Sequence, residues 1–213
     1  ADDCGAGEAV EWLIDFLANK NNPAGENNPA TYDGTPVKMS FYVNGRHAEV
    51  AGESWEKAYK AGHEIGNHTV SHFMDDSGNT IDARKLGDSI WLDELIQNDL
   101  IIMQTLGIPY KEITGFRTPR LEYNSAAFRM MALRGFEYDC SIEEGSEPGH
   151  DGTNNFWPYQ LDNGSMADSL MTLWSSGEDD WGYAPVGQVK GLWEIPVYNY
   201  IVPADKYAKK YCF

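Results

Sequence analysis

The stretch 62–72, GHEIGNHTVSH, decides how the chain is interpreted, because it holds three of the five histidines. Residues 63–67 predict a short strand, and His68 and His72 follow it with three residues between them. In a helical turn this spacing places both imidazoles on one face, where they can share a cation. Thr69 stands where a zinc protease of the H-E-x-x-H type needs Glu. By itself such a pair is more often two solvated histidines near a turn than a metal site.

Helical and extended patterns alternate on both sides of this stretch. Residues 7–20 place Val10, Leu13, Phe16 and Leu17 on one stripe, which predicts an amphipathic helix. Strand–helix alternation favours an α/β fold with a largely parallel sheet, formed by all residues 1–213 as a single domain. The other expected helices are 53–61, 88–106, 125–134 and 203–211, and the expected strands are 37–43, 63–67, 112–117, 136–142 and 192–197.

Composition excludes several classes of protein. Of the 213 residues 42% are hydrophobic, so the chain can form a core and disorder is excluded. The net charge of −17 argues against nucleic acid and anionic membranes as partners. No apolar run approaches the roughly 20 residues of a membrane helix, and the opening ADDCGAGEAV is no signal peptide. Cys4, Cys140 and Cys212 allow three single disulfides, which remain unranked.

Two further clusters of residues strengthen the interpretation of His68 and His72 as metal ligands. Asp2 and Asp3 are adjacent carboxylates, of which one could bind a metal ion and the other act as a general base. The alternative is a solvated acidic terminus. Residues 115–120, GFRTPR, end a predicted strand, where Arg117 could clamp a carboxylate and Pro119 stiffens the turn. The alternative here is a surface arginine that leads into a loop.

Together these motifs resemble the polysaccharide deacetylases, the NodB-homology group that forms carbohydrate esterase family four, and most of all its chitin-deacetylase branch. The resemblance runs in family order over nearly the whole chain. It implies an α/β fold, namely a distorted (β/α) barrel with fewer than eight regular strands, and a secreted enzyme expected to be a monomer. The matching segments are 1–3 for the end of the first motif, 68–72 for the second, 117–119 for the third, 138–141 for the fourth, 192–197 for the last strand, and 156–159.

The resemblance also implies roles for individual residues. Asp3, His68 and His72 would bind a divalent metal, with zinc as the first expectation and Co²⁺ or Ni²⁺ as alternatives. Asp2 would be the general base, and Arg117 would hold it in place. Pro119 and Arg120 would bind the substrate, and the backbone N–H of Arg120 would help to bind the oxyanion. Asp139 would lie near the general acid.

Three positions depart from the family pattern. The histidine that usually acts as general acid is missing from Val197-Tyr198-Asn199, so His150 and Glu194 are the candidates for that role. Arg120 stands where chitin-active members often have Tyr, which could change a sugar subsite. Trp157 could stack on a pyranose ring, or it could pin its loop to the barrel.

The implied reaction is metal-dependent hydrolysis of acetyl groups on polymers or oligomers of N-acetylglucosamine. An acetylxylan esterase is the first alternative and a peptidoglycan deacetylase the second. The competing class is a non-catalytic carbohydrate-binding protein on a decayed barrel, which the missing general acid favours.

Overall fold

A computed structural model describes residues 2, 7–25, 33–145, 157–165 and 186–199 of the chain. Its centre is a six-stranded sheet in the order β1-β2-β3-β4-β7-β6, parallel throughout except that β6 runs antiparallel to β7. A second pair joins β5 and β8 in parallel. The strands are β1 (Ser40–Val43), β2 (Glu64–Asn67), β3 (Gly115–Phe116), β4 (Tyr138–Asp139), β5 (Glu143–Gly145), β6 (Tyr159–Gln160), β7 (Trp193–Glu194) and β8 (Val197–Asn199).

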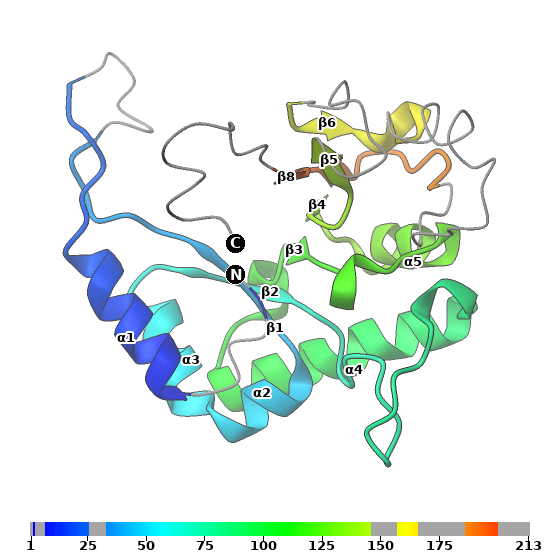
Figure 1. The fold of residues 1–213 in the computed structure, drawn as a ribbon, viewed down its shortest axis with the longest axis horizontal. Coiled ribbons are helices and arrows are strands. Elements are labelled where there is room, and N and C mark those ends of the chain that lie inside the picture. The colour runs from blue at the N-terminus through cyan, green and yellow to red at the C-terminus, as the bar shows by residue number, and fades with distance from the viewer. Residues whose placement is uncertain (1, 3–6, 26–32, 146–156, 166–185, 200–213) are drawn as a thin grey trace, which may run out of the picture.

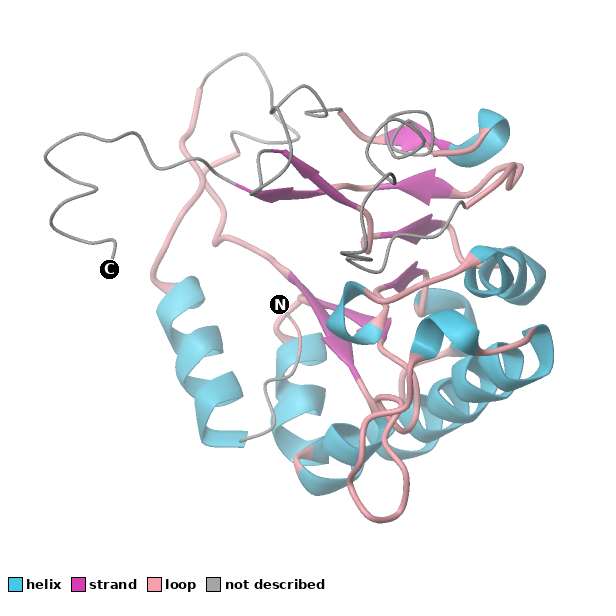
Figure 2. Ribbon diagram, turned by 45° about the vertical axis from the view of Figure 1, so that its right-hand side comes forward, coloured by secondary structure: helices cyan, strands magenta, loops and turns pink. Residues whose placement is uncertain are grey.

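The α-helices of the described residues line one side of this sheet, from α1 at the left of Figure 1, through α2 and α4 below, to α5 at the right. Figure 2 shows the strands stacked above the helices. The longest helix, α4, packs against α2, α3 and α5 and so ties the helical layer together. The helices are α1 (Gly7–Ala18), α2 (Gly45–Val50), α3 (Gly52–Lys60), α4 (Asp88–Leu106) and α5 (Ser125–Arg134), and the 3₁₀ turns are η1 (Ala83–Lys85), η2 (Tyr110–Glu112), η3 (Pro119–Leu121) and η4 (Leu161–Asn163).

The core lies between the sheet and the helices. Phe41 of β1 and Ile65 of β2 are buried in it and meet Trp55 and Trp91 from the helical layer. Such large apolar side chains contribute most of the free energy of folding through the surface they remove from water. This packing holds the strands against the helices, so the ends of the strands can carry polar groups.

The α/β class predicted from the sequence is confirmed, and the main sheet has fewer than eight strands. Within the described residues the sheet stays open rather than closing into a barrel. Helices α4 and α5 have the predicted bounds. The expected helix 203–211 lies outside the described residues. No helix in the described part of the chain has the length and apolarity to cross a membrane.

Two local predictions were wrong. Phe16 was placed on the core stripe of α1, but it is 46% exposed and stacks on Trp12 instead of entering the core. Residues 68–72 do not form a helical turn, because the chain leaves β2 in an irregular bend. Thr69 and His72 both have positive φ there, at 65° and 56°, which a right-handed helix excludes.

Candidate active site

The residues singled out from the sequence gather where the parallel strands end. His68 follows β2, Arg117 follows β3, and Asp139 and Glu194 are the last residues of β4 and β7. Asp2 joins the same region through a parallel bridge to Tyr42 of β1. In α/β folds the carboxyl ends of parallel strands are the usual place for a functional site.

The two histidines lie side by side although their loop is not helical. Their ring centroids are 5.1 Å apart, with the ring planes at 60°. His68 is fully buried, and its Nδ1 lies 2.7 Å from the carbonyl oxygen of Arg117. Because a carbonyl oxygen only accepts hydrogen bonds, Nδ1 carries the proton and donates it. In the neutral ring, Nε2 then keeps its lone pair.

Arg117 connects three parts of the site. Its side chain pairs with the carboxylate of Asp2 at 3.3 Å and donates from Nε to the carbonyl oxygen of Cys140 at 2.8 Å. The guanidinium also lies 4.9 Å from the ring centroid of Tyr42, a cation–π arrangement. Cys140 is a buried free cysteine, and burial raises the pKa of its thiol. These contacts together hold the Arg117 guanidinium beside the carboxylate of Asp2.

The turn after Arg117 has an unusual backbone. Pro119 is buried and begins η3, and Arg120 and Leu121 follow with φ of 56° each. The Arg120 side chain does not stand free for a sugar: it donates to the carbonyl oxygens of His72 and Ile81, both at 3.0 Å.

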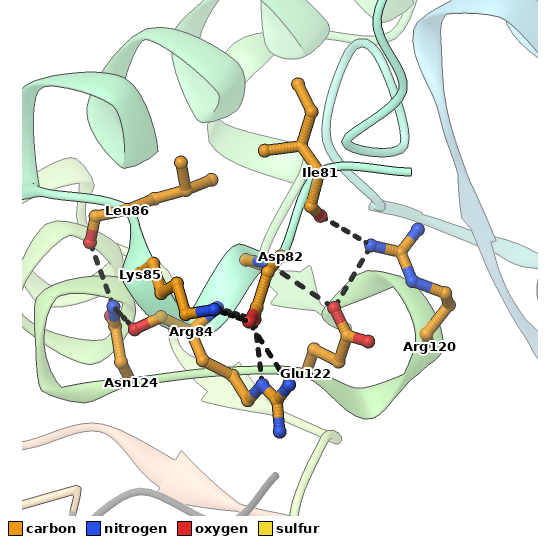
Figure 3. Close-up of polar contacts among 9 residues, drawn as sticks. Ile81, Asp82, Arg84, Lys85, Leu86, Arg120, Glu122 and Asn124 are labelled. Carbon is orange, nitrogen blue, oxygen red and sulfur yellow. Dashed lines mark hydrogen bonds and ion pairs between the residues drawn. The ribbon is translucent and has the colours of Figure 1, made fainter. Parts of the chain in front are cut away.

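Figure 3 shows how the segment after Arg120 is anchored. The Arg120 guanidinium also pairs with Glu122 at 3.1 Å, and Glu122 accepts the backbone N–H of Ala83. Asn124 donates to the carbonyl oxygens of Arg84 and Leu86, both at 2.8 Å. The turn carrying Pro119 is therefore braced against the segment that follows the histidine loop.

Asp139 and Glu194 form a buried carboxyl pair at the ends of neighbouring strands. Desolvation raises the pKa of Asp139 to about 6 and, helped by the neighbouring Asp139, raises the pKa of Glu194 well above its ordinary value. Burial thus favours the neutral, protonated form of a carboxyl group in this pair. Asp139 accepts from the Ser141 hydroxyl at 2.7 Å, and that hydroxyl accepts the N–H of Thr118 at 2.8 Å. The pair thus supports the turn of Arg117.

Other predicted site residues are not placed by the structure. Asp3 and His150 lie outside the described residues, as do Cys4 and Cys212. Among the residues that are described, no cluster of three His, Cys, Asp or Glu side chains could hold a metal ion. Trp157 is 87% exposed, so its ring does not pin a loop to the sheet.

Several supporting residues were missed by reasoning from the sequence. Glu94 of α4 binds the backbone between the two histidines, and Asn67 at the end of β2 accepts the N–H of Thr69 at 2.8 Å. Tyr42 and Ser141 complete the surroundings of Arg117. A polar residue on a helix face gives no signal of which loop it meets, so only Asn67, at a strand end, could have been suspected.

The profile of the polysaccharide deacetylase family matches residues 31–138. The chain belongs to this family. The match includes His68, His72, Arg117 and Pro119, and it ends one residue before Asp139. No curated protein matches the sequence.

The chain is also similar to several solved structures. A protein from Mycobacterium smegmatis assigned as a polysaccharide deacetylase has a TM-score of 0.53 and 17% identity, covering 93% of this chain and 51% of that one. The chain thus spans about half the length of that relative. A family 4 carbohydrate esterase from Streptomyces lividans, solved with acetate, has a TM-score of 0.47 and 16% identity over 68% of this chain and 60% of that one. A family 4 pseudoenzyme from Bacillus anthracis has a TM-score of 0.46 and 15% identity, with coverages of 63% and 39%.

Proposed function

We propose that the chain is a metal-dependent hydrolase that removes acetyl groups from polymers or oligomers of N-acetylglucosamine, with zinc as the metal. Membership of the polysaccharide deacetylase family supports acetylated carbohydrate as the substrate class. The observation that carries the proposal is the pairing of two adjacent imidazoles with an arginine-held carboxylate at one end of the sheet.

The two imidazoles fit a shared metal ion in their spacing. Zinc–nitrogen bonds of about 2.0–2.1 Å place two tetrahedral imidazole ligands with ring centres roughly 5 Å apart. The centroids of His68 and His72 are 5.1 Å apart.

The hydrogen bonding of His68 fits as well. Its Nδ1–H donates to the carbonyl oxygen of Arg117, which orients the ring and leaves Nε2 as the basic nitrogen. Metal-binding histidines commonly donate their other N–H to a carbonyl in this way. His68 and His72 would hold the metal with Asp3 as the third ligand. A bound zinc ion would polarise the acetyl carbonyl and increase the acidity of water.

The proposed base is Asp2. Its carboxylate lies 3.3 Å from the Arg117 guanidinium, which fixes the direction of the carboxylate. An ionised, oriented carboxylate can take the proton of an attacking water molecule. The backbone N–H of Arg120 would then donate to the oxygen on which negative charge develops.

The protonating group for the leaving amine is assigned to Glu194 or His150. Burial and the neighbouring Asp139 raise the pKa of Glu194 well above its ordinary value, which favours the protonated form, but the side chain is fully buried. Its contacts support a part in bracing the Arg117 turn, through Asp139, Ser141 and Thr118.

The test is acetate release from a substrate panel. Chitin oligosaccharides, acetylated xylan and peptidoglycan are incubated with the protein as prepared, after treatment with a chelator, and after zinc is added back. We expect release from chitin oligosaccharides that the chelator abolishes and zinc restores. Preference for xylan or peptidoglycan would reassign the substrate. Binding of a glycan without metal-dependent release from any substrate would replace the hydrolase with a carbohydrate-binding protein.

Polymers of N-acetylglucosamine lie outside cells, so we further propose that the protein is secreted. We also propose that it acts as a monomer. Analytical ultracentrifugation of the purified chain tests the second point. A concentration-dependent dimer would contradict it.

A further inference from the structure

The loop between the two histidines has a shape that its own residues disfavour. Thr69, His72 and Phe73 have φ of 65°, 56° and 49°. Non-glycine residues seldom adopt this left-handed region, and β-branched residues such as Thr least of all. A loop of this kind persists only when contacts from outside it fix the backbone.

Glu94 of α4 provides such contacts. Its Oε2 accepts the backbone N–H groups of Val70 and Ser71, each at 3.0 Å. Its Oε1 accepts the Ser71 hydroxyl at 2.6 Å. The same hydroxyl accepts the backbone N–H of Phe73 at 3.1 Å. One carboxylate thus binds the middle of the loop by three charge-assisted hydrogen bonds, which are stronger than neutral ones.

The helix that carries Glu94 is itself tied to the strands. One turn further along α4, Asn98 donates to the carbonyl oxygen of Val43 at 2.8 Å and to the Asn67 side chain at 3.0 Å. Asn67 in turn donates to the carbonyl oxygen of Leu95 at 2.9 Å. Asn67 and Asn98 are fully buried. Glu94 therefore acts from a support that is fixed relative to the end of β2.

We infer that Glu94 is a positioning residue that fixes His68 relative to His72, because it holds the residues that lie between them. This inference rests on the proposed function, since its consequence for chemistry depends on both histidines binding one metal ion. The hydrogen bonds of Glu94 go to the backbone of Val70 and Ser71 and to the Ser71 hydroxyl, so it acts through the loop.

Zinc affinity of the full chain tests the inference, measured by competition with a chromophoric chelator. Glu94→Ala should weaken zinc binding by about 10–100-fold, the usual effect of losing a group that orients metal ligands. Glu94→Gln should recover most of the affinity, because the amide oxygen can still accept both N–H groups. Asp93→Ala is the matched control: it removes the same charge from the next, exposed position of α4 and should leave the affinity unchanged.

Amide hydrogen exchange of the metal-free protein gives a second readout. In Glu94→Ala the N–H groups of Val70, Ser71 and Phe73 should exchange faster than in the wild type, and in Asp93→Ala they should not. If Glu94→Ala does not fold, Ser71→Ala replaces it. This variant removes the hydroxyl that donates to Oε1 of Glu94 and accepts the Phe73 N–H, and it leaves the two backbone N–H bonds to Oε2 of Glu94 in place. Faster exchange of the Phe73 N–H and weaker zinc binding than in the wild type would support the inference, and wild-type values of both would overturn it.

The outcomes separate the two proposals. Wild-type zinc affinity and unchanged exchange in Glu94→Ala would overturn the role of Glu94 and leave the proposed function standing. Absence of zinc binding in the wild type would overturn the proposed function, while the exchange data would still decide whether Glu94 holds the loop.

Discussion

Nδ1 of His68 donates a hydrogen bond to the carbonyl oxygen of Arg117, and the two atoms are 2.7 Å apart. The Arg117 side chain meanwhile pairs with Asp2. One residue therefore positions an imidazole with its backbone and a carboxylate with its side chain. This arrangement couples the proposed metal ligands to the proposed base, so disturbance of the Arg117 turn should reach both.

His68→Ala should lose zinc binding and deacetylase activity together, because the variant lacks one of the two imidazoles that would hold the metal. Zinc content by elemental analysis and acetate release are measured on the same sample. His47→Ala, in the short helix α2, serves as the histidine control. Retention of stoichiometric zinc by His68→Ala would contradict the ligand assignment.

Asp2→Asn should keep zinc and lose activity by about 10²–10⁴-fold, the usual contribution of a general base. The amide preserves the shape of the side chain, but it lacks the basicity to take a proton. Acetate release under saturating zinc is the measurement, and Asp76→Asn, at an exposed position, is the control. An Asp2→Asn protein as active as the wild type would show that another group is the base.

Glu194→Gln should change how stability depends on pH. Burial raises the pKa of Glu194 well above its ordinary value and that of Asp139 to about 6. The folded state thus binds more protons than the unfolded chain, whose carboxyl pKa values are near 4. The contribution of this pair to the free energy of unfolding is therefore highest below about pH 4 and falls as the pH rises through the raised values.

Because Gln has no proton to lose, the variant should lose less stability than the wild type as the pH rises above about 4. Urea unfolding at several pH values measures this difference. Glu137→Gln, an exposed acid beside β4, should keep the wild-type slope. Parallel curves for Glu194→Gln and the wild type would mean that folding does not raise the pKa of Glu194.

Arg134→Ala should destabilise the fold by about 3–5 kcal/mol, because it leaves a buried carboxylate without its counter-ion. Nε of Arg134 lies 2.6 Å from Asp99, and the two side chains are 3% and 1% exposed. Arg129→Ala breaks the exposed pair with Asp88, where the side chains are 52% and 50% exposed, and should cost less than about 1 kcal/mol. Equal effects of the two variants in chemical denaturation would refute this ranking.

The two best-predicted helices end in a way that sequence makes visible. Gly107 and Gly135 follow α4 and α5 with φ of 68° and 91°, the left-handed cap that glycine adopts readily. The short helix α2 was missed, because its six residues show no periodicity and its start depends on a hydrogen bond from His47 N–H to the Asn44 side chain. Strands such as β3 are shorter than their apolar patterns suggested, since pairing ends where the chain turns toward the site.

The site was predictable in its residue types and only partly in its geometry. The motifs predicted that His68, His72 and Arg117 lie at neighbouring strand ends, and the structure places them there. The left-handed backbone of the histidine loop depends on Glu94, which is distant in sequence, so spacing alone suggested a helical turn instead. The Arg120 side chain likewise binds two backbone carbonyl groups, a use that its position in the motif did not indicate.

The proposed chemistry depends on one metal ion held by His68, His72 and Asp3. Anomalous scattering at the zinc edge, from crystals of the protein grown with zinc, tests it most directly. We predict one strong peak at about 2.0–2.2 Å from an imidazole nitrogen of each histidine and from the Asp3 carboxylate. Crystals that contain zinc at other positions and show no peak between the two imidazoles would contradict the account.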